Sequence, residues 1–259
     1  MTELIGTAPT NTKRNSVVEF KVKTRYTKAL DTTGWLRIKL EPSGVSEYLC
    51  EFVKVVITKE DAKSYFTVLD GIHKGKKGSL GKENAAKCLV DKPRGTGAKI
   101  TAKINGRKKL ISVPRGDGRE LNQLLATLTF DGKSATITLD SDVDYKESNP
   151  MSPDYNKIIH SEPLPKGNYK ILAPQSPKKP SATAFYATNP GGYPDLKYHT
   201  VWFPVEYAPT LNSNFVHVGN LSEGCITMYQ LDMWNPLYLY LISHRSDKEG
   251  NYVGTFTIE

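Results

Sequence analysis

A histidine, a serine, a glycine and a cysteine lie close together near the end of the chain, and together they could form a catalytic centre. Residues 215–227 read FVHVGNLSEGCIT, which places His217, Ser222, Gly224 and Cys225 within a few positions of one another. A thiol is a weak nucleophile until it ionises, and a neighbouring imidazole is the simplest group that would make a thiolate near neutral pH. We therefore expect Cys225 to be a nucleophile and His217 to be its base.

The residues around the cysteine have expected roles of their own. Gly224 lets the backbone turn sharply before the thiol, so that amide N–H groups could face an oxyanion on an attacked carbonyl. Ser222 could orient the imidazole or add a donor. The alternative is structural, because free cysteine is among the most buried residue types and Cys225 could begin a core strand after a glycine turn.

Two segments in order along the chain resemble the L,D-transpeptidase (YkuD-like) family. The first, PLPKGNYKI over residues 163–171, is similar to the Thr-Pro-x-Gly-x-Phe/Tyr-x-Ile segment that opens the catalytic domain of that family. The second, SEGCI over residues 222–226 with His217 before it, resembles the family's active-site signature. The resemblance implies that His217 is the base, Cys225 the nucleophile, and Ser222 and Gly224 the signature residues between them.

The second segment also departs from the family pattern. The spacer after His217 is short, Glu223 stands where the family usually has a second histidine, and Thr227 stands near the position of an Arg or Asn. Compact relatives, among them L,D-transpeptidase-like type VI secretion effectors and phage-associated proteins, are closer to this spacing. The resemblance therefore implies a divergent branch, and it assigns no role to Glu223.

The reaction that the resemblance implies is acyl transfer on peptidoglycan stem peptides. Cys225 would attack the carbonyl of the diamino-acid residue and expel the terminal D-alanine, with His217 taking the thiol proton. A stem-peptide amine, a free D-amino acid or water could then accept the acyl group, giving a transpeptidase, an exchange enzyme or a carboxypeptidase. No cofactor is implied.

Other residues are secondary candidates for the site. His199 is an alternative base, with a structural histidine as its default role. Gly192 and Tyr193 belong to a glycine-rich loop that could border a substrate groove. His160 and His244 are expected at the surface. Cys50 and Cys88 could pair in an oxidising compartment or be two separately buried thiols, and the spacing of His and Cys residues indicates no metal site.

Charge is divided unevenly over the 259 residues. Residues 1–150 hold 27 Lys and Arg against 18 Asp and Glu, whereas residues 151–259 hold 8 against 9. A cationic half attracts polyanions such as acidic wall polymers, nucleic acid or an anionic membrane, although a solvated basic surface is the commoner reason for spread charge. The start of the chain lacks the pattern of a secretory signal, and no transmembrane segment is predicted. An enzyme of the cell wall or periplasm would then need delivery by a non-Sec route, and a protein without this activity would be cytoplasmic.

Short β-branched or alternating segments separated by Gly, Pro or Asp predict a mainly β protein. We expect an accessory or binding domain over residues 1–145, built as a small β-barrel or sandwich, and a catalytic domain over residues 155–259 with one or two helices. The polar, proline-punctuated segment 141–156 would be the boundary. Residues 17–23 are an expected strand, and helices are expected at residues 118–127, from the spacing of three leucines, and at residues 232–243.

Two other functions compete with acyl transfer. The chain could be a non-catalytic protein that binds the cell wall or an assembly, and its N-terminal domain could have a secretion or phage-assembly component as its partner. Nucleic-acid binding is the least favoured: residues 68–80 resemble a KOW-like loop with three lysines between glycines, but no aromatic stacking platform lies beside them.

Overall fold

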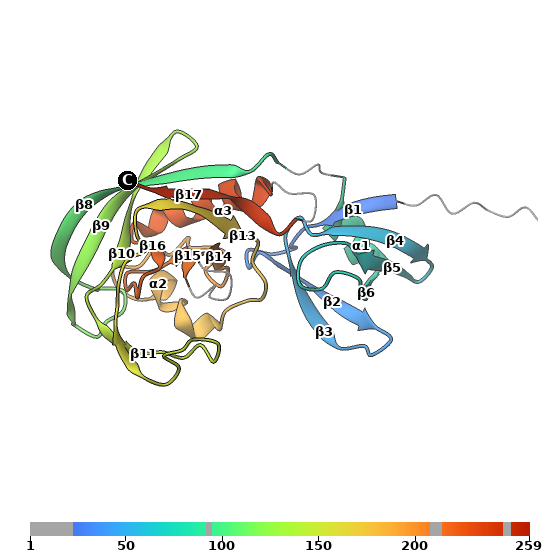
Figure 1. Cartoon of the computed structure of the whole chain (residues 1–259). Coiled ribbons are helices and arrows are strands. Elements are labelled where there is room, and N and C mark those ends of the chain that lie inside the picture. The colour runs from blue at the N-terminus through green and yellow to red at the C-terminus, as the bar shows by residue number, and fades with distance from the viewer. Residues whose placement is uncertain (1–22, 92–94, 208–213, 246–249) are drawn as a thin grey trace, which may run out of the picture.

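The chain folds into an N-terminal β-sheet followed by a closed β-barrel, with few and short helices (Figure 1). The computed structural model describes residues 23–91, 95–207, 214–245 and 250–259. The expectation of a mainly β protein is confirmed. Most of the strand expected at residues 17–23 lies outside the described residues, and the first described strand begins at Lys23.

The N-terminal sheet has seven strands in the order β3-β2-β6-β5-β4-β1-β7, and all the pairs are antiparallel. Alternation places one face of each strand in the core, as in β5, where Ser64, Phe66 and Val68 are all buried. The KOW-like segment covers the connection between β5 and β6 and continues into β6, and Gly71 and Gly75 in the connection have positive φ. The elements are β1 (Lys23–Thr27), β2 (Trp35–Glu41), β3 (Ser46–Cys50), β4 (Lys54–Glu60), β5 (Lys63–Val68), β6 (Lys77–Gly81), α1 (Lys82–Cys88) and β7 (Leu89–Val90).

The barrel closes eight strands in the order β10-β16-β15-β14-β13-β17-β8-β9. Two of its pairs, β15 with β16 and β17 with β8, are parallel, and the others are antiparallel. Its strands are β8 (Ala98–Ile111), β9 (Glu120–Phe130), β10 (Lys133–Asp140), β13 (Gly167–Leu172), β14 (Phe203–Glu206), β15 (Phe215–Val218), β16 (Ile226–Met228) and β17 (Tyr252–Ile258).

The helix expected at residues 118–127 is wrong, because this segment lies largely in the long strand β9. Leu121, Leu124 and Leu125 have helical spacing, but the buried positions of β9 follow another set, with Gln123 and Ala126 buried between Leu121 and Leu128. A polar residue at a core position, Gln123, concealed the strand alternation. Tertiary pairing with β8 and β10 therefore overrides the local leucine pattern.

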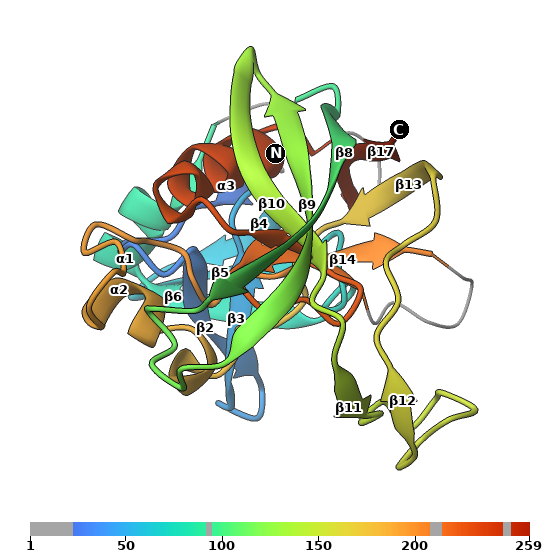
Figure 2. The same ribbon diagram turned by 90° about the vertical axis from the view of Figure 1, so that its left-hand side faces the viewer.

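The two sheets divide the chain earlier than the boundary expected at residues 141–156. Strands β8, β9 and β10, which we expected in the N-terminal domain, belong to the same barrel as β13–β17. The change from one sheet to the other falls between β7, which ends at Val90, and β8, which begins at Ala98. Polar and proline residues at 141–156 mark a hairpin projecting from the barrel instead of a linker (Figure 2). Its strands are β11 (Asp144–Lys146) and β12 (Ile158–His160).

The helices of the barrel part are η1 (Pro180–Ala182), α2 (Phe185–Thr188), η2 (Leu231–Met233) and α3 (Trp234–Ser243). Helix α3 confirms the expectation for residues 232–243, with Pro236 in its first turn where a missing N–H costs no hydrogen bond. Its buried face includes Trp234, Leu237, Tyr238 and Leu241. The helix thereby contributes a large part of the apolar core.

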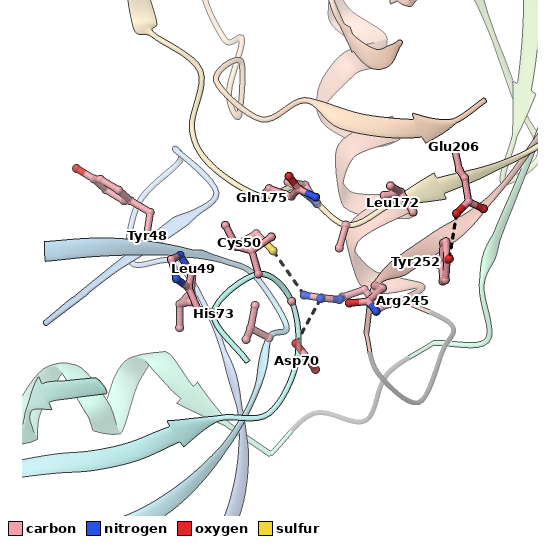
Figure 3. Close-up of a pocket in the computed structure, with 16 residues that line it drawn as sticks. Tyr48, Leu49, Cys50, Asp70, His73, Leu172, Gln175, Glu206, Arg245 and Tyr252 are labelled. Atoms are coloured by element: carbon pink, nitrogen blue, oxygen red, sulfur yellow. Dashed lines mark hydrogen bonds and ion pairs between the residues drawn. The ribbon is translucent and has the colours of Figure 1, made fainter. Parts of the chain in front are cut away.

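Buried polar contacts join the N-terminal sheet to the barrel (Figure 3). Arg245, which follows α3, is 1% exposed, lies 3.5 Å from the carboxylate of Asp70 and donates to the carbonyl of Glu51 at 3.0 Å. The hydroxyl of Tyr238 donates to the Glu51 carboxylate at 3.0 Å. A cavity of about 290 Å³ borders these contacts. Cys50 lies beside Arg245, and both Cys50 and Cys88 are free, buried thiols.

Candidate active site

Strands β15 and β16 bring His217 and Cys225 to one cavity. The strands run parallel with His217 paired to Thr227, and the seven residues 219–225 connect them. So short a connection between parallel neighbours is possible because the strands have only four and three residues. Both side chains line a cavity of about 420 Å³, together with Trp202, Arg115 and Glu223. The residues expected to carry the chemistry are therefore neighbours in the fold.

The imidazole of His217 is buried, with 7% of the residue exposed, and both of its nitrogens are engaged. Nδ1 lies 2.9 Å from the carbonyl oxygen of Val218 and can only donate to it, so Nε2 carries the lone pair. Nε2 lies 3.2 Å from the hydroxyl of Thr227, which donates to it. Trp202 stacks on the ring with centroids 4.1 Å apart. Burial lowers the pKa of His217 to about 4, so the ring is a neutral base at neutral pH.

The thiol of Cys225 is half-buried and is protonated in this state. Burial raises its pKa to about 12, although the backbone N–H of Phe215 favours the thiolate and partly offsets the rise. Among the described residues, the sulfur and the ring of His217 share no hydrogen bond. The resting pair is thus a neutral thiol beside a neutral imidazole, where we had expected a thiolate near neutral pH. The reason is desolvation, which acts against the charged form of both groups.

The sharp turn expected at Gly224 is confirmed. Its φ is +93°, and a Cβ at this position would lie 2.5 Å from the carbonyl oxygen of Glu162. Asn214 donates its side-chain N–H to the Gly224 carbonyl at 2.8 Å, which holds the turn against β15. Within the described chain, the amide N–H groups of Gly224 and Cys225 donate no hydrogen bond. Both amides are therefore candidate donors to an oxyanion.

Ser222 supports the turn and makes no hydrogen bond to the imidazole of His217. Its hydroxyl donates to the carbonyl of Cys225 at 2.7 Å, and its amide donates to the hydroxyl of Ser141 at 2.7 Å. The side chain is fully buried. Thr227 makes the hydroxyl contact with His217 that we had considered for Ser222.

A second cavity, of about 770 Å³, meets Cys225 from another side. Its lining includes four carboxylates, those of Glu147, Asp154, Glu162 and Glu223. Among the described residues, His160 is the only basic side chain that lines it; His160 contacts Asp142 and Asp144 and is exposed, as expected. The hairpin β11–β12 forms part of this wall. Cys225 therefore lines both the cavity that contains His217 and this acidic cavity.

Sequence reasoning missed two groups beside the thiol and the imidazole. The role of Thr227 was not predicted, because its contact with His217 depends on the parallel register of β15 and β16. Lys178 was missed because it lies on a connecting segment outside both motifs; its Nζ is 4.3 Å from the ring centroid of Phe215 and 5.2 Å from that of Trp202. Its charge acts on both Cys225 and His217. No signal in the sequence distinguishes it from other lysines.

The secondary candidates lie apart from the thiol. Nδ1 of His199 lies 2.9 Å from the hydroxyl of Thr183, and His199 lines neither of the cavities that contain Cys225. Gly192 and Tyr193 border a separate cavity of about 460 Å³. His244, which we expected at the surface, is half-buried, and its Nδ1 lies 2.7 Å from the carbonyl oxygen of Tyr240. The geometry favours His217 over His199 as the base.

No cluster of three or more His, Cys, Asp or Glu side chains suited to a metal ion occurs within the described residues. None of the helices in the described ranges has the length and apolar character needed to cross a membrane. Comparisons of the chain with protein-family models, with curated proteins and with solved structures found no match in any of the three.

Proposed function

We propose that this protein is a cysteine acyltransferase that acts on peptidoglycan stem peptides. The observation that carries the proposal is the meeting of Cys225 and His217 in one cavity, next to a glycine turn whose amide N–H groups donate no hydrogen bond within the described residues. A nucleophile, a neutral base and oxyanion donors are the three groups that acyl transfer needs. The resemblance to L,D-transpeptidases supplies the choice of substrate.

In the acylation step, the sulfur of Cys225 attacks the carbonyl carbon of the diamino-acid residue while the thiol proton passes to Nε2 of His217. The carbonyl oxygen becomes an oxyanion facing the amides of Gly224 and Cys225. Collapse breaks the C–N bond, and D-alanine leaves with the proton that His217 held. Because the free thiolate is unfavourable in this site, proton transfer accompanies the attack and does not precede it.

In the second step, an acceptor attacks the thioester and its proton returns to Cys225 through His217. The carboxylates of the acidic cavity favour an amine acceptor, because an amine arrives as an ammonium ion attracted by negative charge. The amine must lose its proton before it attacks. This arrangement supports transpeptidation or D-amino-acid exchange over hydrolysis.

The test is incubation of wild type and Cys225→Ala with muropeptides, following D-alanine release and new products by mass spectrometry. Release by wild type alone, with a crosslinked or exchanged product, is expected. If some peptide is hydrolysed, adding a D-amino acid should lower the amount of hydrolysed peptide and raise the amount of exchanged product. No release by a folded wild type would refute the proposal.

One observation favours a second function, that of a non-catalytic wall-binding protein. A thiol whose pKa is about 12 is what a structural cysteine would have. In that case the basic N-terminal sheet would do the binding. Sedimentation with purified cell walls that is the same for wild type and Cys225→Ala, without D-alanine release, would support this alternative.

A further inference from the structure

Lys178 places a cation near Cys225 and His217. It lies in the segment between β13 and η1, and its amide donates to the carbonyl of Thr200 at 2.9 Å, which fixes the backbone. Its ammonium group lies against the rings of Trp202 and Phe215. Trp202 lines the cavity that contains His217, and Phe215 lines the acidic cavity. Lys178 itself lines neither of these two cavities but a third one, of about 870 Å³, and its charge still acts on Cys225 and His217.

This cation has no carboxylate partner within the described residues. Arg115, which lines the cavity that contains His217, differs because it forms an ion pair with Asp117 at 2.7 Å. Lys178 is half-buried, and two aromatic rings are a weak substitute for an anion. A partly desolvated ammonium without a counter-ion is suited to bind an anionic ligand.

The thiolate of Cys225 is not the anion that best explains Lys178. Of the influences on the thiol, the charge of Lys178 is the weakest, and burial outweighs it. A substrate carboxylate is a better match. In the proposed reaction, the leaving residue carries a free carboxylate about one residue, roughly 3.5 Å, from the attacked carbonyl. The carboxylates of Glu147, Asp154 and Glu162, which line only the acidic cavity, would repel that group and favour the side of Lys178.

We propose that Lys178 binds the free α-carboxylate of the leaving residue and thereby makes the enzyme select peptides that end at that residue. This inference rests on the proposed function and adds to it the group that distinguishes a chain terminus from an internal peptide bond. Lys178 acts through binding and orientation, and it takes no part in proton transfer.

The first test uses two alkylating reagents of similar size, anionic iodoacetate and neutral iodoacetamide, on wild type, Lys178→Met and Lys178→Arg. Mass spectrometry of the peptide that contains Cys225 gives each rate. Both reagents require the thiolate, so a change in thiol ionisation cancels in the ratio of the two rates. Methionine keeps an unbranched stem to pack on Trp202 and Phe215, and arginine keeps the charge.

We expect the iodoacetate-to-iodoacetamide ratio to fall about 10-fold in Lys178→Met and to be retained in Lys178→Arg, as for loss of a charge-assisted contact. Thermal unfolding followed by circular dichroism checks that the variants are folded. Equal ratios in the three proteins would overturn the inference. This readout does not require any peptidoglycan activity.

The second test uses a stem tetrapeptide ending in free D-alanine and the same peptide ending in D-alaninamide. Lys178→Met should lower kcat/KM for the acid by about 10- to 100-fold and leave that for the amide unchanged. An equal loss on both peptides would mean a structural role and would overturn the inference. If wild type processes neither peptide, the proposed function fails, while the alkylation ratio still decides whether Lys178 recognises anions.

Discussion

The buried neutral imidazole of His217 should make the protein less stable as the pH falls. Its pKa is about 6.5 in an unfolded chain and about 4 in the folded protein. Between these values the unfolded chain binds more protons than the folded protein, so the stabilising contribution is complete above pH 6.5 and is lost as the pH falls toward 4. Because the residue is 7% exposed, solvent screening is small.

The linkage relation gives the size of this effect. From pH 7 to pH 5, the wild type should lose about 2 kcal/mol of unfolding free energy through His217 alone, and about 3 kcal/mol by pH 4. His217→Gln keeps a polar side chain of similar length but does not titrate. Burial also lowers the pKa values of His73 and His199. These and other groups with shifted pKa values contribute equally to both proteins.

The assay is urea unfolding at pH 7 and pH 5, monitored by tryptophan fluorescence. We expect the wild type to lose about 2 kcal/mol more than His217→Gln between these two pH values, whatever the stability of the variant at pH 7. Parallel losses in the two proteins would refute the reasoning, because His217 would then titrate as an exposed residue and would not be held as a neutral base.

Three further predictions concern the turn, the thiol and the joint between the two sheets. In chemical denaturation, Gly224→Ala should destabilise the protein by more than Gly44→Ala. Both glycines have positive φ, where an alanine costs about 1–3 kcal/mol, but only at Gly224 would the new Cβ lie against a backbone carbonyl. Equal losses of stability would contradict the geometry of the turn. The rate of iodoacetamide alkylation at Cys225 should still rise above pH 9, because its pKa is about 12, whereas a plateau near pH 7 would mean a thiolate in the resting site. Arg245→Met should lower the unfolding free energy by about 3–5 kcal/mol, because the buried carboxylate of Asp70 loses its cationic partner, and a loss below about 1 kcal/mol would show that this ion pair does not hold the sheets together.

Structural features that depend on residues close together in the sequence were predictable. Gly224 before Cys225 predicted a turn, and the structure places that turn against Glu162. Short alternating segments predicted a mainly β chain, and the apolar run with Pro236 near its start predicted helix α3. In each of these cases the backbone conformation depends on neighbours within a few positions.

Features set by distant contacts were not predictable in the same way. Strand β9 was mistaken for a helix because pairing with β8 and β10, and not leucine spacing, decides its conformation. The place of β8–β10 in the barrel depends on pairs such as Ile258 with Ala102, which are far apart in sequence. The role of Thr227 and the position of Lys178 follow from that closure, as does the burial that keeps the thiol and the imidazole neutral.

The central claim is that Cys225 forms a thioester with a stem peptide, and an acid-quenched reaction tests it most directly. Wild type and Cys225→Ala would be mixed with a disaccharide-tetrapeptide, quenched within seconds, digested at low pH and analysed by mass spectrometry. We predict that the peptide containing Cys225 gains the mass of the substrate less D-alanine, in wild type only. An unmodified Cys225 in folded wild type, over a range of quench times and with no D-alanine released, would contradict the account.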